Sequence, residues 1–324
     1  MRSSSAGRAV GVALGAVVLQ LLMIIAFGWP AARVAPRDVP IAVAGPQAEA
    51  VASRLDRERP GAFEITIRAD EAAARADLTG RAAYGAIVTT PSGPRVLVAS
   101  AASPVVAQLL GQMAATLGGA PAAPVQDVVA TDPDDPRGSG FGALALPLVM
   151  SALAAAVLFS YAVPAIAWRA AGLATFAVLG GLAVTALAQG WLSVLEGPYL
   201  GVAGVMALTI LAVSGTVAGL AAVLGRAGPG VGALTFLLVG NPLSGATSAP
   251  ELLPQPWGLI GQYLPPGASA TLLRSVAFYD GATPAGPLLV LTAWAVAGLA
   301  LLAAGAVRGR AQKAPADERR PVLA

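Results

Sequence analysis

Long uncharged runs of apolar residues dominate this chain and predict helices that cross a membrane. Residues 9–28 form one such run of 20 residues, and at ~1.5 Å per residue a helix of that length spans a hydrocarbon core of ~30 Å. Between residues 138 and 307 only six charged side chains occur, and they divide the region into further apolar runs. The expected spans are 9–28, 141–163, 170–192, 199–224, 230–248 and 286–307. The expected fold class is therefore an α-helical polytopic membrane protein with six transmembrane helices.

The first span has a second interpretation, a cleaved signal peptide, because the small residues Ala31 and Ala32 follow it. A run of 20 apolar residues is longer than the roughly 7–15 of a signal-peptide core, which favours an uncleaved anchor.

Residues 30–138 have a different pattern, in which short alternating or apolar stretches are separated by polar residues and turns. Asp70 is positioned to cap a helix, and PSGP at 91–94 predicts a hairpin turn. We expect a small inserted extracytoplasmic α/β domain, which either moves with the second span or covers the membrane part passively. The expected strands are 39–45, 62–68, 83–90 and 95–100, and the expected helices are 46–57, 70–80 and 103–118.

The distribution of arginine predicts the orientation of the chain. Arg2 and Arg8 precede the first span, Arg169 and Arg226 fall in two short connections, and further basic residues follow the last span. The positive-inside rule then predicts a multi-pass protein of the plasma (inner) membrane with cytoplasmic N- and C-termini. The expected organisation is 1–29 (cytoplasmic N-terminus and first span), 30–138 (extracytoplasmic domain and linker), 139–307 (five further spans) and 308–324 (cytoplasmic tail).

Composition excludes several classes of function. Charged residues make up 11% of the chain, against roughly 25% in soluble domains. The chain has no Cys and no His, which excludes disulfides, thiolate catalysis, a Ser-His-Asp triad and the usual zinc ligands. Of the 37 charged residues, 22 lie between residues 33 and 137, where acidic ones outnumber basic ones, so nucleic acid is not an expected partner.

No catalytic, cofactor-binding or metal-binding residues are predicted. Asp132, Asp134 and Asp135 lack the spacing of a calcium loop and are interpreted as a solvated linker. The expected spans contain no Asp, Glu or His for ion coupling, and the chain contains no P-loop motif. The protein is therefore not expected to be an enzyme, and the energy for any transport would come from another subunit.

The region 249–285 remains apolar but is broken by prolines, so it cannot form one straight span. We expect a reentrant segment with short helices at 255–263 and 267–279, the second capped by Ser269 or nearby backbone. Arg274 lies opposite the apolar side of that helix, with Asp280 as its nearest acidic partner and Glu251 a more distant one. It would either meet lipid headgroups or have a gating or substrate-facing role.

Two stretches of the sequence resemble the permease subunits of ABC-2-type transporters, including the YhgE/Pip-like members. Residues 69–93, ADEAAARADLTGRAAYGAIVTTPSG, are similar to that family's acidic-start helix, basic or glycine turn and following strand. Residues 241–274, NPLSGATSAPELLPQPWGLIGQYLPPGASATLLR, are similar to its proline-rich signature after the fifth span. The order of elements is similar too, with a large extracytoplasmic domain between the first two spans and a broken fifth span.

The resemblance implies an exporter of a hydrophobic or amphipathic substrate, without cofactors of its own. Its path would lie between two permease subunits, as a homodimer or heterodimer, and separate cytoplasmic ABC ATPase subunits would power it. Membrane lipid is the remaining expected partner. The residues implied at the gate are Asn241, Pro242, Ser244 and Gly245, and those implied to shape the reentrant helices are Pro254, Pro265, Pro266 and Gly267.

Permeases of this family usually carry a coupling helix between the second and third spans, whereas here the connection is only 165–172. An ATPase contact would require the inner end of the second span to bend and expose Trp168 and Arg169. Without an ATPase, the chain would be a non-transporting, membrane-anchored envelope scaffold that displays its extracytoplasmic domain to a partner.

Overall fold

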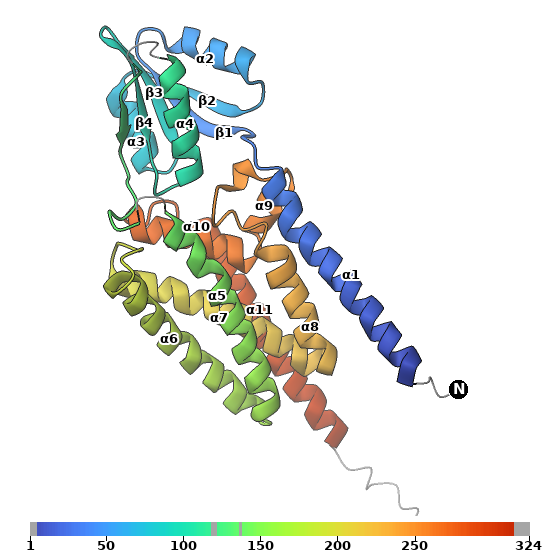
Figure 1. The fold of residues 1–324 in the computed structure, drawn as a ribbon. Helices are drawn as coiled ribbons and strands as arrows, with labels where there is room; N and C mark the ends of the chain where they lie inside the picture. The colour runs from blue at the N-terminus through green and yellow to red at the C-terminus, as the bar shows by residue number, and fades with distance from the viewer. Residues whose placement is uncertain (1–4, 118–121, 136–137, 314–324) are drawn as a thin grey trace, which may run out of the picture.

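The computed structural model describes residues 5–117, 122–135 and 138–313, so residues 1–4 and the predicted tail beyond residue 313 lie outside it. The chain forms a bundle of long helices with a small domain, here called the sheet domain (residues 33–135), at one end (Figure 1). We call that end of the bundle the domain end and the opposite one the far end.

The sheet domain contains a five-stranded mixed sheet in the order β2-β1-β3-β4-β5. β1 pairs in parallel with both β2 and β3, and β3 pairs antiparallel with β4 across the predicted hairpin turn. The predicted cap is confirmed, because Asp70 accepts a hydrogen bond from the N–H of Ala73 (2.8 Å). The strands are β1 (Val39–Ala44), β2 (Phe63–Arg68), β3 (Gly85–Thr90), β4 (Gly93–Val98) and β5 (Val125–Asp127), and the helices are α2 (Ala48–Glu58), α3 (Glu71–Thr79) and α4 (Pro104–Leu117).

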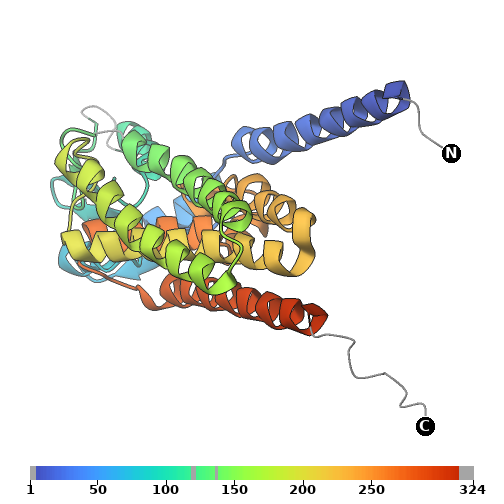
Figure 2. The ribbon, with the colours of Figure 1, turned by 90° about the horizontal axis from the view of Figure 1, so that it is seen from below.

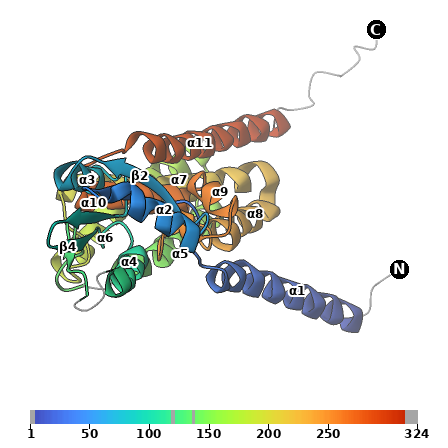
Figure 3. The same ribbon diagram turned by 90° about the horizontal axis from the view of Figure 1, so that it is seen from above.

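Helices cover both faces of this sheet. Side chains alternate between faces along a strand: Ile41 and Val43 of β1 pack with α2 and α4, whereas Ala42 and Ala44 pack with α3. Figure 3 shows the domain from above. Residues of the bundle complete both layers, Leu252 on the first face and Tyr279 on the second. The sheet domain therefore shares its cores with the bundle.

Five helical stretches are long and apolar enough to cross a membrane, which confirms a multi-pass architecture in coarse form. One of them, Tyr199–Gly240, is 42 residues long. They comprise α1 (Ser5–Ala32), α5 (Ser139–Ala162), α6 (Ile166–Gly190), the 42-residue stretch that contains α7 (Tyr199–Leu224) and α8 (Gly228–Ala233), and α11 (Ala285–Lys313).

The 42-residue stretch folds back on itself after α7. Gly228 lies against the backbone of Leu220, and Gly232 lies against the side chain of Val217, so the two arms run antiparallel. The second arm is a six-residue helix followed by seven residues of π-helix, shorter than the ~30 Å core requires. Six complete crossings therefore stay a prediction.

Helix α7 is the centre of the bundle and packs against α5, α6, α10 and α11. Glycines allow these close contacts: a Cβ on Gly219 would lie 2.6 Å from the carbonyl oxygen of Gly298 in α11. By contrast, α1 extends beside the bundle (Figure 2), and only Pro30 of its residues is buried. The apolar helices α1 and α7 thus differ in environment, because α7 is buried in the bundle and α1 is exposed along its length.

Helix α5 begins at an unexpected cap. Asp135 accepts hydrogen bonds from the backbone N–H groups of Ser139 (3.0 Å) and Gly140 (2.8 Å), and it is buried. The interpretation of this aspartate as part of a solvated linker was wrong, because its carboxylate satisfies N–H groups that a helix start leaves unpaired.

After the π-helix the chain forms turns and short helices, here called the broken segment (residues 240–285). It contains a 3₁₀ turn (Pro250–Leu252), α9 (Trp257–Gln262) and α10 (Pro265–Phe278). Both predicted short helices are present, although α10 starts two residues earlier than expected. Ser269 lies inside α10 and its hydroxyl is hydrogen-bonded to that of Thr209 in α7 (2.8 Å), so it is not the cap.

Candidate functional site

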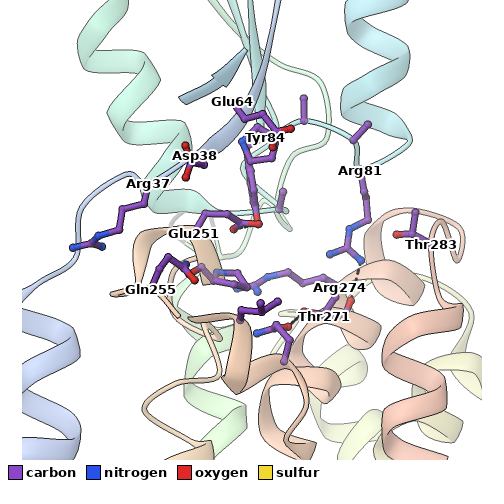
Figure 4. Close-up of a pocket in the computed structure, with 17 residues that line it drawn as sticks. Arg37, Asp38, Glu64, Arg81, Tyr84, Glu251, Gln255, Thr271, Arg274 and Thr283 are labelled. Carbon is purple, nitrogen blue, oxygen red and sulfur yellow. Dashed lines mark hydrogen bonds between the residues drawn. The ribbon is translucent and has the colours of Figure 1, made fainter. Parts of the chain in front are cut away.

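A cleft of about 720 Å³ lies between the sheet domain and the broken segment. We call it the interdomain cleft, and Figure 4 shows the residues that line it. Its volume falls within the roughly 300–1,000 Å³ typical of ligand pockets. Its charged lining residues are Arg37, Asp38, Glu64, Arg81, Glu251 and Arg274.

Arg274 of α10 lines the cleft from the broken segment and is only 5% exposed. Its Nη2 donates to the carbonyl oxygen of Ala246 (2.6 Å) and its Nη1 to that of Gly245 (3.4 Å). The guanidinium carbon lies 4.5 Å from the centre of the Phe141 ring, a cation–π arrangement. The interpretation of α10 as an amphipathic helix at the membrane surface, with Arg274 exposed to bulk lipid headgroups, was therefore wrong, because tertiary contacts bury the charge in the wall of the cleft.

The turn that receives Arg274 is built by neighbouring polar groups. Gly245 has φ +66°, and a Cβ there would lie 2.9 Å from the backbone nitrogen of Pro250, so the turn requires glycine. The Ser244 hydroxyl donates to the carbonyl oxygen of Asn241 (2.7 Å) and accepts from the N–H of Ala246 (3.2 Å). Gln262 of α9 donates to the carbonyl oxygen of Ser244 (3.0 Å). Side chains thus provide hydrogen bonds for backbone N–H and C=O groups of this turn, which have no partners in a helix.

Arg81 and Tyr84 line the cleft from the sheet domain. Arg81 sits in the turn after α3 with φ +60° and donates to the carbonyl oxygen of Thr271 in α10 (2.9 Å). The Tyr84 hydroxyl donates to Oε2 of Glu251 (2.8 Å). Burial lowers the pKa of Arg81, whereas burial and then the charge of Glu251 raise the pKa of Tyr84 well above its ordinary value. Both residues join the two parts of the chain.

Backbone hydrogen bonds close one side of the cleft. The N–H of Ala35 donates to the carbonyl oxygen of Leu252 (3.0 Å), and the N–H of Arg37 donates to that of Glu251 (3.1 Å). The Arg37 guanidinium also donates to the carbonyl oxygen of Leu252 (3.0 Å). The chain entering β1 is thereby fixed to the 3₁₀ turn of the broken segment.

The charged side chains of the cleft do not neutralise one another in direct ion pairs. Across the described ranges, the ion pairs within 4.0 Å are Arg54–Glu58, Arg68–Asp77, Arg75–Glu71 and Arg95–Glu71, none of which lines the cleft. Burial lowers the pKa of Arg274, and the charge of Arg81 lowers it further, whereas the charge of Glu251 opposes this shift. The cleft therefore holds three guanidinium groups and three carboxylates without a direct ion pair.

The structure brings part of the sequence-predicted gate together around Arg274. Asn241, Ser244 and Gly245 belong to the turn described above, and Pro242 is half-buried next to it. The side-chain oxygen of Asn241 is buried without a hydrogen-bond partner. These residues border the cleft through Arg274 and Gln262.

The predicted reentrant-helix residues are structural and lie away from the lining. Pro265 and Pro266 occupy the first turn of α10, where a proline costs no hydrogen bond, and both are buried. A Cβ on Gly267 would clash with the carbonyl of Gly261, so α9 and α10 meet at glycine. The carbonyl oxygen of Pro254 accepts from the N–H of Gly258 (3.1 Å).

The predicted ATPase-facing residues lie at the far end and point in different directions. Trp168 is 74% exposed, whereas Arg169 is 8% exposed. Arg169 donates to the carbonyl oxygens of Ser160 (3.0 Å) and Val163 (3.0 Å), which end α5 without helical partners. The exposure that an ATPase contact would require is therefore present at Trp168 but not at Arg169.

Sequence reasoning did not single out Arg37, Arg81 or Tyr84. Arg81 and Tyr84 lie within the stretch 69–93 that carries the family resemblance, but a turn arginine and a tyrosine before a strand carry no local signal of a cleft. Glu251 was named only as a distant partner of Arg274, yet its charge acts on that residue whereas Asp280 is exposed.

No group of three or more acidic residues capable of holding a metal ion occurs within residues 5–117, 122–135 and 138–313. The site is thus a polar cleft between a sheet domain and a bundle of apolar helices, in a protein with the architecture of a multi-pass membrane protein. No protein-family model, curated protein or solved structure matches this chain.

Proposed function

We propose that this protein is the membrane-spanning permease subunit of an ABC-2-type exporter. It moves a hydrophobic or amphipathic substrate outward, and a separate cytoplasmic ATPase supplies the energy. In this proposal it resides in the plasma (inner) membrane beside a second permease subunit, with the sheet domain on the extracytoplasmic side.

The observation that carries the proposal is the broken segment at the domain end of the bundle. There the chain leaves helical geometry through a π-helix and continues as turns, α9 and α10 beneath the sheet domain. Non-helical backbone at membrane depth is tolerated where it is buried in protein or lines a cavity, which is typical of gates and binding sites. This arrangement agrees with the reentrant segment that the resemblance implies.

The far end supplies a surface for an ATPase. Trp168 in the first turn of α6 and Arg226 in the α7–α8 connection are both exposed there. Arginine in short connections favours the cytoplasmic side. With Arg169 engaged by carbonyl oxygens, the proposed contact rests on Trp168 and Arg226.

Affinity purification of the full chain from its native membrane in mild detergent tests the proposal. We expect a P-loop ATPase without transmembrane helices to copurify, and we expect W168A together with R226Q to lower its recovery severalfold. W257A is the matched control, because Trp257 is an exposed tryptophan of α9 at the domain end. Absence of an ATPase from the purified wild-type protein would contradict the proposal.

A specific observation favours a second candidate function, a non-transporting envelope scaffold that presents the sheet domain to a partner. Only three residues, 163–165, connect α5 to α6, and the α7–α8 turn comprises three more. Neither connection forms a projecting coupling helix. Recovery of envelope proteins in place of an ATPase in the same purification would favour the scaffold.

A further inference from the structure

We propose that the interdomain cleft binds an amphiphile with a zwitterionic headgroup, with its phosphate at Arg81 and Arg274 and its ammonium group toward Asp38 and Glu64. The inference rests on the geometry of the cleft, so it stands or fails independently of any ATPase partner.

Arg81 and Arg274 have N–H donors that make no hydrogen bond within the described chain, and these donors favour an anionic ligand group in the cleft. Each guanidinium carries a fork of N–H donors that matches phosphate or carboxylate oxygens. Arg81 donates one hydrogen bond and Arg274 two, in each case to neutral backbone carbonyls. The two guanidinium groups repel one another electrostatically. A phosphate between them replaces this repulsion with attraction.

The carboxylates of the cleft explain why the ligand also carries a positive charge. Arg37, Arg81 and Arg274 are matched in number by Asp38, Glu64 and Glu251. Glu251 already accepts the Tyr84 hydroxyl, whereas Asp38 and Glu64 are exposed and lie at the upper margin of the cleft in Figure 4. An ammonium group at this margin pairs with Asp38 and Glu64. The phosphate and the ammonium group together make a ligand without net charge, which matches the equal numbers of arginines and carboxylates in the cleft.

The wall formed by α9 explains why the ligand is an amphiphile. Leu259 lines the cleft and is 56% exposed, and its neighbours Trp257, Ile260 and Tyr263 are also exposed. Exposed aromatic and aliphatic side chains beside apolar spans are typical of the membrane interface. A headgroup in the cleft can therefore leave its acyl chains against α9. The same headgroup chemistry exists in soluble phosphate esters, and the experiment below separates the two sources.

Isothermal titration of the purified full chain in detergent tests the proposal. The probes are dihexanoyl-phosphatidylethanolamine, its phosphatidylglycerol analogue, dihexanoylglycerol, and soluble phosphoethanolamine. We expect phosphatidylethanolamine to bind at least about tenfold more tightly than the phosphatidylglycerol analogue, and dihexanoylglycerol not to bind. Phosphoethanolamine binding as tightly as the lipid identifies a soluble source, and much weaker binding identifies a lipid.

Substitutions connect the binding to named residues. R81Q removes one phosphate contact, and we expect about tenfold weaker binding, whereas D38N with E64Q should remove the preference for the ammonium-bearing lipid. R54Q is the matched control, because Arg54 is an exposed arginine of α2 outside the cleft. Since Asp38 and Glu64 are exposed, their substitution keeps a test available even if R81Q weakens the fold. Binding of dihexanoylglycerol equal to that of phosphatidylethanolamine, or equal binding by all variants, overturns the proposal.

Discussion

At the domain end of the bundle the chain leaves helical geometry inside the protein, whereas at the far end it turns in contact with its surroundings. The turn at 244–246 is buried and held by Arg274, Gln262 and Ser244. The α7–α8 turn at 225–227 is exposed. The same backbone groups must be satisfied in both places, by side chains at one end and by the surroundings at the other.

This difference indicates where the protein has specific chemistry. Buried turns require particular donors at particular positions, so the domain end gathers arginine, glutamine and glycine around a cleft. Exposed turns do not require particular donors, and at the far end Trp168 in the first turn of α6 and Arg226 in the α7–α8 turn lie at the surface. We therefore expect substitutions at the domain end to lower stability and most substitutions at the far end to leave it unchanged. Arg169 is the exception at the far end, because it donates to carbonyl oxygens at the end of α5.

The largest expected effect is at Gly261, where α9 lies against the backbone of Leu243. A Cβ there clashes with the Leu243 carbonyl oxygen, so G261A should lower the free energy of unfolding by about 1–3 kcal/mol or more. The control G230A is at the far end, where an added Cβ would meet no side chain or other helix within 4 Å, and alanine should leave stability unchanged or raise it by up to about 1 kcal/mol. Thermal unfolding of both variants in detergent measures the contrast, and equal melting temperatures would contradict it.

The next largest effect on stability is expected at Arg169, the buried arginine at the far end. R169Q removes the donors to the carbonyl oxygens of Ser160 and Val163, and we expect a loss of about 1.5–3 kcal/mol, the range for hydrogen bonds to charged groups. W168A, one residue away, should change stability by about 0.5 kcal/mol or less because its side chain is exposed. A larger loss for W168A than for R169Q would show that this end is packed differently.

A smaller effect is expected at the contact between Tyr84 and Glu251. Y84F removes a hydrogen bond to a carboxylate across the cleft, which should cost about 1.5 kcal/mol, the low end of the range for charged partners, because Glu251 is only half-buried. Y263F, at an exposed tyrosine of α9, is the control and should be neutral. Denaturant unfolding followed by a probe on the sheet domain measures the difference, and neutrality of Y84F would show that this contact does not fasten the domain.

The smallest effect is a pH dependence of that same contact. Because burial and Glu251 raise the pKa of Tyr84 above the value of about 10 found in unfolded chains, the hydroxyl stays protonated in the folded protein at neutral pH. Its contribution is fully present below pH ~10 and is lost as the pH rises from there toward the folded pKa. The stability difference between wild type and Y84F should therefore be constant from about pH 6 to 9 and shrink above about 10. A change between pH 6 and 9 would assign the dependence to another group.

The sequence predicted the sheet domain well because its signals are local. Asp70 caps α3, as the sequence indicates. Residues 91–92, within the predicted turn at 91–94, join β3 to β4. The strand β5 was missed, because three exposed residues after a proline-rich stretch show no alternation. Long apolar runs likewise located the candidate spans.

The cleft could not be predicted from local patterns. Helical periodicity placed Arg274 opposite the apolar side of α10, but a turn almost thirty residues earlier and the Phe141 ring bury it. Hydropathy also failed to distinguish α1 from α7, although one is exposed along its length and the other is buried. The burial of Arg274 and of α7 depends on contacts between segments that are distant in the sequence, and local sequence patterns do not show such contacts.

The cleft depends on the contacts that fasten the sheet domain to the helical bundle, namely those of Arg37, Arg81 and Tyr84. Because the chain contains no cysteine, R54C on α2 and L200C at the start of α7 introduce the only two thiols, both at exposed positions. Pulsed electron–electron resonance between spin labels at these sites in lipid nanodiscs measures their separation. A sheet domain held by these contacts gives one narrow distance distribution, whereas a broad or two-peaked distribution would show that the contacts do not hold it.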